Sequence, residues 1–231
     1  NCDLSYIKKA IEDISKVLKD EDLVIIESTI PPGTTNKVVM PFLRKQHKKL
    51  KIYLSHAPER AIPGKTLKEM IRNNRIIGGI DQKSTNLTKE IYKSFVKGKI
   101  YLTDSTTAEF VKLIENTFRD INIAFANELV GICDRYKISV WEAIDLANLH
   151  PRVFIHQPGP GVGGHCISTD PWFLIKKPED NGTRFIKLAR DINDFMPHQV
   201  VKNISQILKG IKNPRITILG VAYKADVDDW R

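Results

Sequence analysis

Cysteine is scarce in this sequence, and long apolar runs are absent. The 231 residues include only Cys2, Cys133 and Cys166, an odd number at distant, unpatterned positions. Such usage argues against a disulfide framework and against a zinc site, so we expect no metal and a functional cysteine would act as a thiol. No stretch approaches the roughly 20 apolar residues that cross a bilayer, and the start, Asn1-Cys2-Asp3, has no signal-peptide pattern. We therefore expect a cytoplasmic protein with no membrane contact.

Acidic residues are outnumbered by basic ones. The sequence has 36 Lys and Arg against 27 Asp and Glu, a net charge of +9, which fits either a nucleic acid or an anionic small ligand. The basic residues are spread over predicted amphipathic helices, such as 44–51 and 83–99, without an aromatic platform or a recognised nucleic-acid motif among them. We therefore interpret them as solvated helix faces and expect no nucleic acid partner.

The order of the apolar patterns predicts an α/β fold. A helical period from Leu4 to Leu18 precedes the continuous apolar run Leu23–Ile26, which is typical of a buried parallel strand. Further strand-like and helical segments follow in alternation, at 52–54, 75–78, 82–94 and 100–102. Alternation of this kind favours a sheet covered by helices.

A long helical pattern without proline follows, from Ser105 to about Tyr136. A helix of about 30 residues is well above the usual length, and it commonly links two domains or pairs with its twin in a dimer. The segments predicted after it are a short helix at 141–149, a Gly- and Pro-rich loop, helices at 183–195 and 198–209, and a strand at 216–219. We therefore expect an α/β part at 1–104, a helical part at 105–212 and the start of a second sheet at 213–231, with both ends of the chain cut or missing.

The segment from Gly159 to Trp172 carries the most chemistry. Its glycines allow a backbone to approach a phosphate closely and to present amide N–H groups to an anion. If a helix begins just after Cys166, its positive end favours a thiolate there and so a better nucleophile. Taken alone, the same residues also fit a tight structural turn with an inert buried cysteine, and Asp170 before Pro171 also fits an ordinary helix cap.

Six motifs in a fixed order favour the chemical interpretation. They are Glu27-Ser-Thr-Ile-Pro-Pro-Gly-Thr-Thr35, Pro58-Glu-Arg-Ala-Ile-Pro-Gly64, Asn73-Asn-Arg-Ile-Ile-Gly-Gly79, Lys112 with Asn116, the Gly-rich loop with Cys166, and Gly220-Val-Ala-Tyr-Lys224 with Arg231. In this order they resemble the UDP-glucose/GDP-mannose dehydrogenase family over essentially the whole chain. The segment His150-Pro-Arg-Val153 and the residues from Gln157 to Phe173 resemble the UDP-N-acetylmannosamine branch of that family in particular.

The resemblance implies two Rossmann-like domains joined by the long helix. Residues 1–104 would be the second half of an NAD-binding domain, 105–212 a central dimerisation domain with the catalytic loop, and 213–231 the start of a UDP-binding domain. The implied cofactor is NAD, the substrate a UDP-sugar, and the assembly a homodimer through the long helix. Because no Gly-x-Gly-x-x-Gly follows a strand here, we expect about 100 further residues upstream and poor NAD binding by this chain alone.

The same resemblance implies an oxidation of a primary alcohol at C6 of the sugar to a carboxylate, through an aldehyde. Cys166 matches the nucleophile that captures the aldehyde. Lys112 and Asn116, one helical turn apart, match residues that stabilise an oxyanion at C6, although their spacing alone favours an exposed lysine and a solvated asparagine. Asp170 matches a carboxylate that orients a water and the lysine, and Glu59 matches one implicated in thioester hydrolysis.

The remaining matched residues are implied to bind ligands. Thr29, which follows a strand end, matches a residue beside the nicotinamide and the active-site water. The positions implied to bind the cofactor are Glu27, Ser28, Thr29 and Arg231. Those implied to bind the substrate are Arg60, Lys112, Asn116, His150, Arg152, Gly161, Gly163, Gly164, Tyr223 and Lys224. Arg152 resembles an arginine that reaches the sugar nucleotide of a neighbouring subunit, whereas without the motifs each basic residue fits a surface role equally well.

One departure from the family pattern bears on the substrate. The UDP-glucose branch has a second glutamate four residues after the first, where this sequence has Pro63, and Arg60 with Pro63 fits the N-acetylhexosamine branches instead. The leading hypothesis is oxidation of UDP-N-acetyl-D-mannosamine to its uronic acid. The alternatives are a UDP-N-acetylglucosamine 6-dehydrogenase, a non-catalytic dimerisation core or nucleotide-binding module, and a basic nucleic-acid binder.

Overall fold

The computed structural model describes residues 3–62, 64–175, 181–220 and 222. The chain forms two compact units, Asn1–Ile114 and Glu115–Arg231. The first unit contains α1 (Ser5–Ser15), β1 (Leu23–Ile26), a π-helical turn η1 (Thr35–Val39), α2 (Met40–Gln46), β2 (Tyr53–His56), α3 (Thr66–Arg72), β3 (Arg75–Gly79), α4 (Gln82–Lys93), β4 (Ile100–Asp104) and the first part of α5 (Ser105–Tyr136). The four strands predicted in this unit and the opening helix are thus confirmed, whereas α3 was not predicted.

The four strands form one mixed sheet in the order β1-β2-β3-β4. The pairs β1–β2 and β3–β4 are parallel, but β3 runs antiparallel to β2, with His56 opposite Gly78. When the register between β2 and β3 is extended past the paired residues, Glu59 lies opposite Arg75. The start of β3 therefore reaches the edge of the sheet at which β1 and β2 end.

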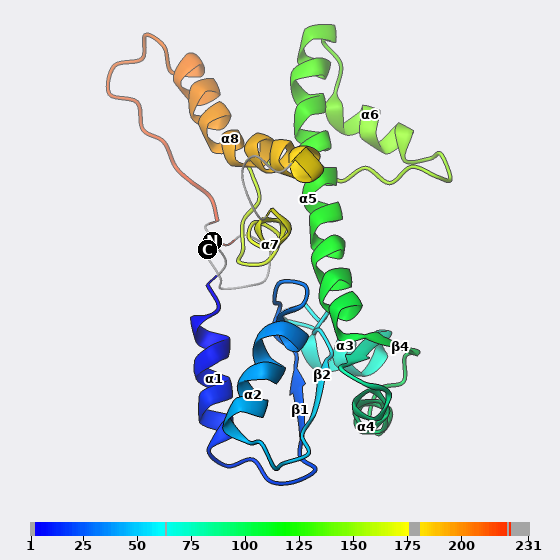
Figure 1. Cartoon of the computed structure of the whole chain (residues 1–231). Helices are drawn as coiled ribbons and strands as arrows, with labels where there is room; N and C mark the ends of the chain where they lie inside the picture. The colour runs from blue at the N-terminus through cyan, green and yellow to red at the C-terminus, as the bar shows by residue number, and fades with distance from the viewer. Residues whose placement is uncertain (1–2, 63, 176–180, 221, 223–231) are drawn as a thin grey trace. The chain divides into compact units, whose positions relative to one another are not determined.

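Helices cover both faces of this sheet (Figure 1). Along β1 the side chains alternate, as a strand requires: Val24 and Ile26 pack in a core with α1 and α2, and Ile25 packs in a second core with Tyr92 of α4. All four residues of β2 are buried, which is typical of a strand covered on both sides. This confirms the predicted α/β fold.

The second unit consists of the rest of α5, then α6 (Val140–Ala147), α7 (Pro171–Leu174), the 3-10 turn η2 (Asn181–Thr183) and α8 (Arg184–Ile207). The long helix was predicted with the ends that α5 has, and the short helix at 141–149 corresponds to α6. Ala126 and Cys133 of α5 pack against Val140 and Ile144 around α6.

Three predictions about this fold were wrong. The two helices expected at 183–195 and 198–209 are one helix, α8, with Pro197 inside it, because the buried contacts of Arg190 and Asn193 hold the turn before the proline. Residues 216–219 form no strand, since no described segment pairs with them. The basic helix expected at 44–51 ends earlier, as α2 ends at Gln46, whereas α4 agrees with the helix predicted at 82–94.

Within the described ranges, no helix combines the length and the apolar character needed to cross a membrane.

The N-terminus of α4 offers a direct test of how this fold is stabilised. The side chain of Asp81 accepts a 2.7 Å hydrogen bond from the backbone N–H of Ser84. Asp81→Ala should lower the free energy of unfolding by about 1 kcal/mol, because that amide loses its acceptor. Asp81→Asn keeps an acceptor and should lose only a few tenths. Urea denaturation measures both, and equal losses would show that the cap does not contribute.

Candidate active site

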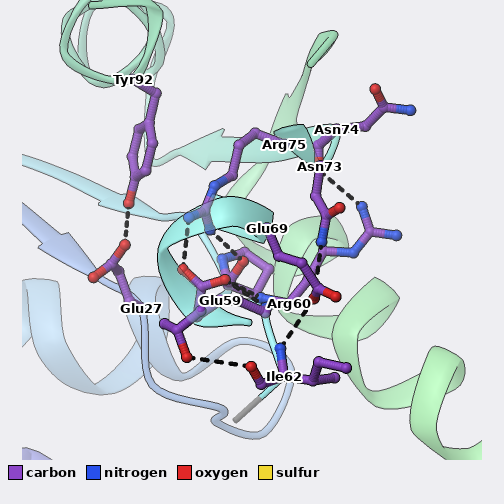
Figure 2. Close-up of polar contacts among 12 residues, drawn as sticks. Glu27, Glu59, Arg60, Ile62, Glu69, Asn73, Asn74, Arg75 and Tyr92 are labelled. Atoms are coloured by element: carbon purple, nitrogen blue, oxygen red, sulfur yellow. Dashed lines mark hydrogen bonds and ion pairs between the residues drawn. The ribbon is translucent and has the colours of Figure 1, made fainter. Parts of the chain in front are cut away.

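Glu59 and Arg75 form an ion pair at the edge where β1 and β2 end and β3 begins (Figure 2). Arg75, 2% exposed, places its Nη2 2.6 Å from Glu59 Oε2 and donates through Nη1 to the Pro58 carbonyl at 3.2 Å. The second carboxylate oxygen accepts from the backbone N–H groups of Arg60 and Ala61, both at 2.6 Å. Both carboxylate oxygens of Glu59 thus accept hydrogen bonds from donors that favour the ionised carboxylate.

These contacts decide the charge of Glu59. Partial burial pushes its pKa upwards, but the bond from Arg75 and the two backbone N–H groups outweigh it, so the pKa lies below its ordinary value of 4.5. Glu59 is therefore ionised at neutral pH and fixed in direction. Such a carboxylate can orient a water, although it is a weak proton acceptor.

Tyr92 of α4 links the same arginine to Glu27 at the end of β1 (Figure 2). The guanidinium carbon of Arg75 lies 4.9 Å from the centre of the Tyr92 ring. The Tyr92 hydroxyl donates a hydrogen bond to the carboxylate of Glu27. Burial and that carboxylate raise the pKa of Tyr92, so the hydroxyl remains a donor at neutral pH. Glu27, Tyr92, Arg75 and Glu59 are consequently one contiguous polar chain.

The loop after Glu59 is held by a second set of contacts (Figure 2). Arg60 donates through Nη1 to the Asn74 carbonyl at 3.0 Å. Glu69 of α3 accepts from the Ile62 N–H at 3.0 Å and from the Asn73 side chain at 3.4 Å. The motifs at 58–64 and 73–79 therefore contact each other, with α3 between them in sequence. Pro63 lies outside the described residues.

Thr29 lies in the loop after β1 and is half-buried, whereas Glu27 and Ser28 are exposed. This loop is held from α5 by Glu109, which is fully buried and accepts from the backbone N–H groups of Gly33 and of Thr35, the latter at 2.7 Å. Gly33 has φ +89°, a conformation that favours glycine.

Glu109 lies three residues before Lys112 on α5, and Lys112 is half-buried. The sequence motifs did not indicate Glu109. The available signal was that the segment Pro32-Gly33-Thr34-Thr35 leads into a helix, whose first N–H groups need acceptors.

Cys166 is exposed, in contrast to Cys133, which is 5% exposed in the core around α6. The interpretation of Cys166 as an inert buried cysteine was therefore wrong. Its carbonyl accepts from the N–H groups of Thr169 at 3.1 Å and Asp170 at 2.8 Å, so residues 166–170 form a turn that leads into α7.

Asp170 is 4% exposed, and its Oδ2 accepts a 2.6 Å hydrogen bond from the side chain of Asn116 on α5, itself 6% exposed. Its side chain does not cap α7, although it stands at the N-cap position. The expectation of a solvated Asn116 is therefore wrong, whereas Asp170 occupies the expected N-cap position before Pro171 but makes no side-chain cap. Asn116 and Asp170, both predicted as site residues, are thus in direct contact although 54 positions separate them in the sequence.

The other predicted binding residues differ in their surroundings. His150 and Arg152 are exposed beside each other, with Arg152 Nη2 3.4 Å from His150 Nε2. Gly161 has φ +136° and Gly164 has φ +79°, conformations that side chains rarely adopt, and Gly163 is exposed. The predicted positions Tyr223, Lys224 and Arg231 lie outside the described residues. In the described part of the chain, no three His, Cys, Asp or Glu side chains are grouped so as to hold a metal ion.

Comparison with known protein families assigns both halves of the chain. Residues 1–96 match the NAD binding domain of the UDP-glucose/GDP-mannose dehydrogenase family, and residues 106–195 match the central domain of the same family. The chain belongs to the UDP-glucose/GDP-mannose dehydrogenase family. The resemblance based on the six motifs is confirmed.

Three relatives within the dehydrogenase family are between 46% and 55% identical to this chain. The chain is 55% identical to the UDP-N-acetyl-D-mannosamine dehydrogenase of Methanococcus maripaludis over 100% of its own length and 52% of that protein. It is 46% identical to an NDP-N-acetyl-D-galactosaminuronic acid dehydrogenase of Ralstonia nicotianae, over 99% of the chain and 56% of that protein. A solved structure of the UDP-D-ManNAc dehydrogenase of Pyrococcus horikoshii superposes with a TM-score of 0.92 at 49% identity, covering 99% of this chain and 56% of that one. The chain thus spans about half the length of the relatives it matches.

His56, the last residue of β2, gives the first unit a predictable response to pH. It is fully buried, and burial, partly offset by the backbone of Ile26, lowers its pKa from 6.5 to about 4. The unfolded chain therefore binds a proton as the pH falls through about 6.5, whereas the folded chain does not until about 4. Stability should be full above pH 6.5 and fall by up to about 3 kcal/mol between these two values.

The test is urea denaturation of the wild type and of His56→Leu between pH 7 and pH 4. The leucine variant cannot titrate and should lose less stability over this range. His198→Leu, at an exposed position, is the control and should keep the wild-type slope. A wild-type slope in His56→Leu as well would exclude His56 as its cause.

Proposed function

We propose that this chain supplies the Cys166 site of an NAD-dependent dehydrogenase that oxidises UDP-N-acetyl-D-mannosamine at C6 to the uronic acid. The observation that carries the proposal is the exposed thiol of Cys166, four residues before a buried carboxylate, Asp170, that Asn116 holds. The names of the relatives from Methanococcus maripaludis and Pyrococcus horikoshii support the choice of sugar.

The residues after β1 fit the nicotinamide end of NAD. Open α/β sheets bind ligands at the carboxyl ends of their strands, and Glu27, Ser28 and Thr29 offer a carboxylate and two hydroxyls there. Tyr92 fixes the carboxylate of Glu27. Such groups suit ribose hydroxyls and a carboxamide. When bound, NAD accepts a hydride from C6 in each of the two oxidation steps.

Cys166 performs the covalent chemistry in this proposal. Its thiolate adds to the aldehyde carbon, which gives a thiohemiacetal that keeps one hydrogen on C6. After the second oxidation the acyl group remains on the sulfur as a thioester, and a water molecule releases the acid and restores the thiol. An inert or buried sulfur could not take part in either step.

The other polar residues have supporting roles in the proposal. Lys112 and Asn116 stabilise the negative charge that develops on the oxygen at C6. Asp170, which is fixed by its bond to Asn116, orients a water molecule in the active site. Glu59, which Arg75 keeps ionised, orients the water that cleaves the thioester. Arg60 and Arg152 offer their positive charge to the sugar nucleotide.

Substitution of Cys166 tests the proposed reaction. In the full-length protein, Cys166→Ser should lower acid production from UDP-N-acetyl-D-mannosamine by a factor on the order of 10³ or more, because the nucleophile is removed. Cys133→Ser alters a buried thiol and is the control, with near wild-type turnover expected at temperatures where it is folded. Product analysis with the mannosamine and glucosamine epimers completes the assay. Unchanged acid formation by Cys166→Ser, or turnover of the glucosamine epimer alone, would contradict the proposal.

We further propose that two copies of the chain associate through α5. Exposed aromatic and aliphatic side chains border a cavity of about 430 Å³ in the second unit, among them Phe118, Phe125, Phe154, Phe185 and Leu188. Exposed apolar surface of this kind marks interaction sites. Arg152 lines the same cavity, so a partner that covers it would lie next to a proposed substrate residue.

Phe125→Glu tests the association, because Phe125 is 49% exposed and a charge there should not be tolerated in an apolar interface. Sedimentation of the full-length protein should show a dimer weakened by tenfold or more for this variant. Phe110→Glu, on the same helix but not at the cavity, and 44% exposed, should leave the dimer intact. Equal behaviour of the two variants would remove the support for this surface.

A further inference from the structure

A buried ion pair between α5 and α8 begins a chain of hydrogen bonds in the second unit. Asp120 is fully buried and Arg190 is 2% exposed, and Arg190 Nη1 lies 2.5 Å from Asp120 Oδ1. Arg190 also pairs with Asp194 one turn later on α8. The ion pair thus fixes a carboxylate, which can only accept hydrogen bonds.

The carboxylate of Asp120 sets the direction of every bond that follows. Asn193 points its amide NH₂ at Asp120, with 2.9 Å contacts to the carbonyl and to Oδ1. The oxygen of Asn193 is therefore turned towards Asn127, whose NH₂ donates to it at 3.0 Å. This in turn directs the oxygen of Asn127 to the backbone N–H of Gly159, which donates to it at 2.8 Å.

Gly159 begins the loop that contains Cys166, and the end of this loop is also bound to α5. Asp170 accepts from Asn116 at 2.6 Å. Asn116, Asp120 and Asn127 are spaced by four and seven residues, so they lie on one face of the helix. The loop from Gly159 to Asp170 is therefore attached to one helix face at both ends, with Cys166 between the two attachments.

We propose that Asn127 and Asn193 are positioning residues for the thiol of Cys166, with the Asp120–Arg190 pair fixing the direction of their hydrogen bonds. Neither asparagine is proposed to touch the substrate. Asn127 holds the start of the loop as Asn116 holds its end, and Asn193 keeps the amide of Asn127 from rotating. The inference rests on the proposed role of Cys166.

The experiment compares three variants of the full-length protein with UDP-N-acetyl-D-mannosamine as substrate. Asn127→Ala removes the acceptor of Gly159 and should lower kcat by about tenfold or more, because a loop displaced by about 1 Å misplaces the sulfur, while KM changes less than threefold. Aldehyde captured by added hydroxylamine should increase relative to acid, since the sulfur no longer retains C6. Asn127→Asp keeps an acceptor for Gly159 and should fall between Asn127→Ala and the wild type.

Asn148→Ala is the matched control. Asn148 also bridges backbone groups, those of Ile155, through both ends of its amide, but it does not hold the Cys166 loop. It should lower Tm to a similar extent without raising the ratio of captured aldehyde to acid. If Asn127→Ala does not fold, Asn127→Asp serves for the same comparison.

Two outcomes are distinguished. A kcat within twofold of wild type and an unchanged aldehyde ratio in the folded Asn127 variants would overturn the positioning role, even where Cys166→Ser is inactive. Acid production by Cys166→Ser would overturn the proposed function itself, because no sulfur would then need to be positioned.

Discussion

Buried polar side chains on α5 determine the course of the loops on which the proposed chemistry depends. A polar group removed from water costs free energy unless it is hydrogen-bonded, by roughly 1–3 kcal/mol on mutational evidence and more for a charge. Glu109 meets this requirement through the loop after β1, whereas Asn116 and Asn127 meet it through the loop around Cys166. The packing of each loop against α5 is therefore linked to the buried side chain that the loop satisfies.

The mixed sheet provides a second constraint of the same kind in the first unit. If β3 were parallel to β2, its first residue would lie at the opposite edge from the residues that follow β1 and β2. Because β3 is antiparallel, Arg75 instead lies opposite Glu59 and stacks on Tyr92. Removing one member of such a cluster would leave a buried charge without its partner, which is far more costly than the contact itself is stabilising. The ionised state of Glu59 therefore depends on the topology of the sheet.

The sequence was sufficient for the elements whose patterns are local. The apolar run Leu23–Ile26 is β1, and the helical period from Ser105 to Tyr136 is α5 with the same ends. The sequence was insufficient where the structure of a segment depends on a residue far from it along the chain. Residues 216–219 have a strand pattern but no described partner strand, and Asp170 stands at a helix N-cap yet bonds to Asn116.

The same limit applies to the candidate site. The motifs indicated Cys166, Asn116 and Asp170, because the family resemblance is carried by those residues themselves. Arg75 lies in the motif at 73–79 without a role implied for it, and Asn127 lies in none of the motifs, so only the packing of the folded chain reveals what they hold. Residues that position others are thus harder to predict than residues that react, since their significance lies in a partner that the sequence does not identify.

Pro197 lies inside α8 and beside Gly161 of the Cys166 loop. In an α-helix the carbonyl of residue i−4 accepts from the N–H of residue i, and proline has none, so α8 leaves the carbonyl of Asn193 without its usual donor. That carbonyl faces Gly161, where an added Cβ would lie 3.4 Å from it and 3.5 Å from the Pro197 ring. Gly161 also has φ +136°, so a side chain there would be strained even with more space. The missing hydrogen bond in α8 and the glycine of the loop therefore lie next to each other. Asn193 contributes to both, because its side chain orients Asn127 and its backbone carbonyl faces Gly161.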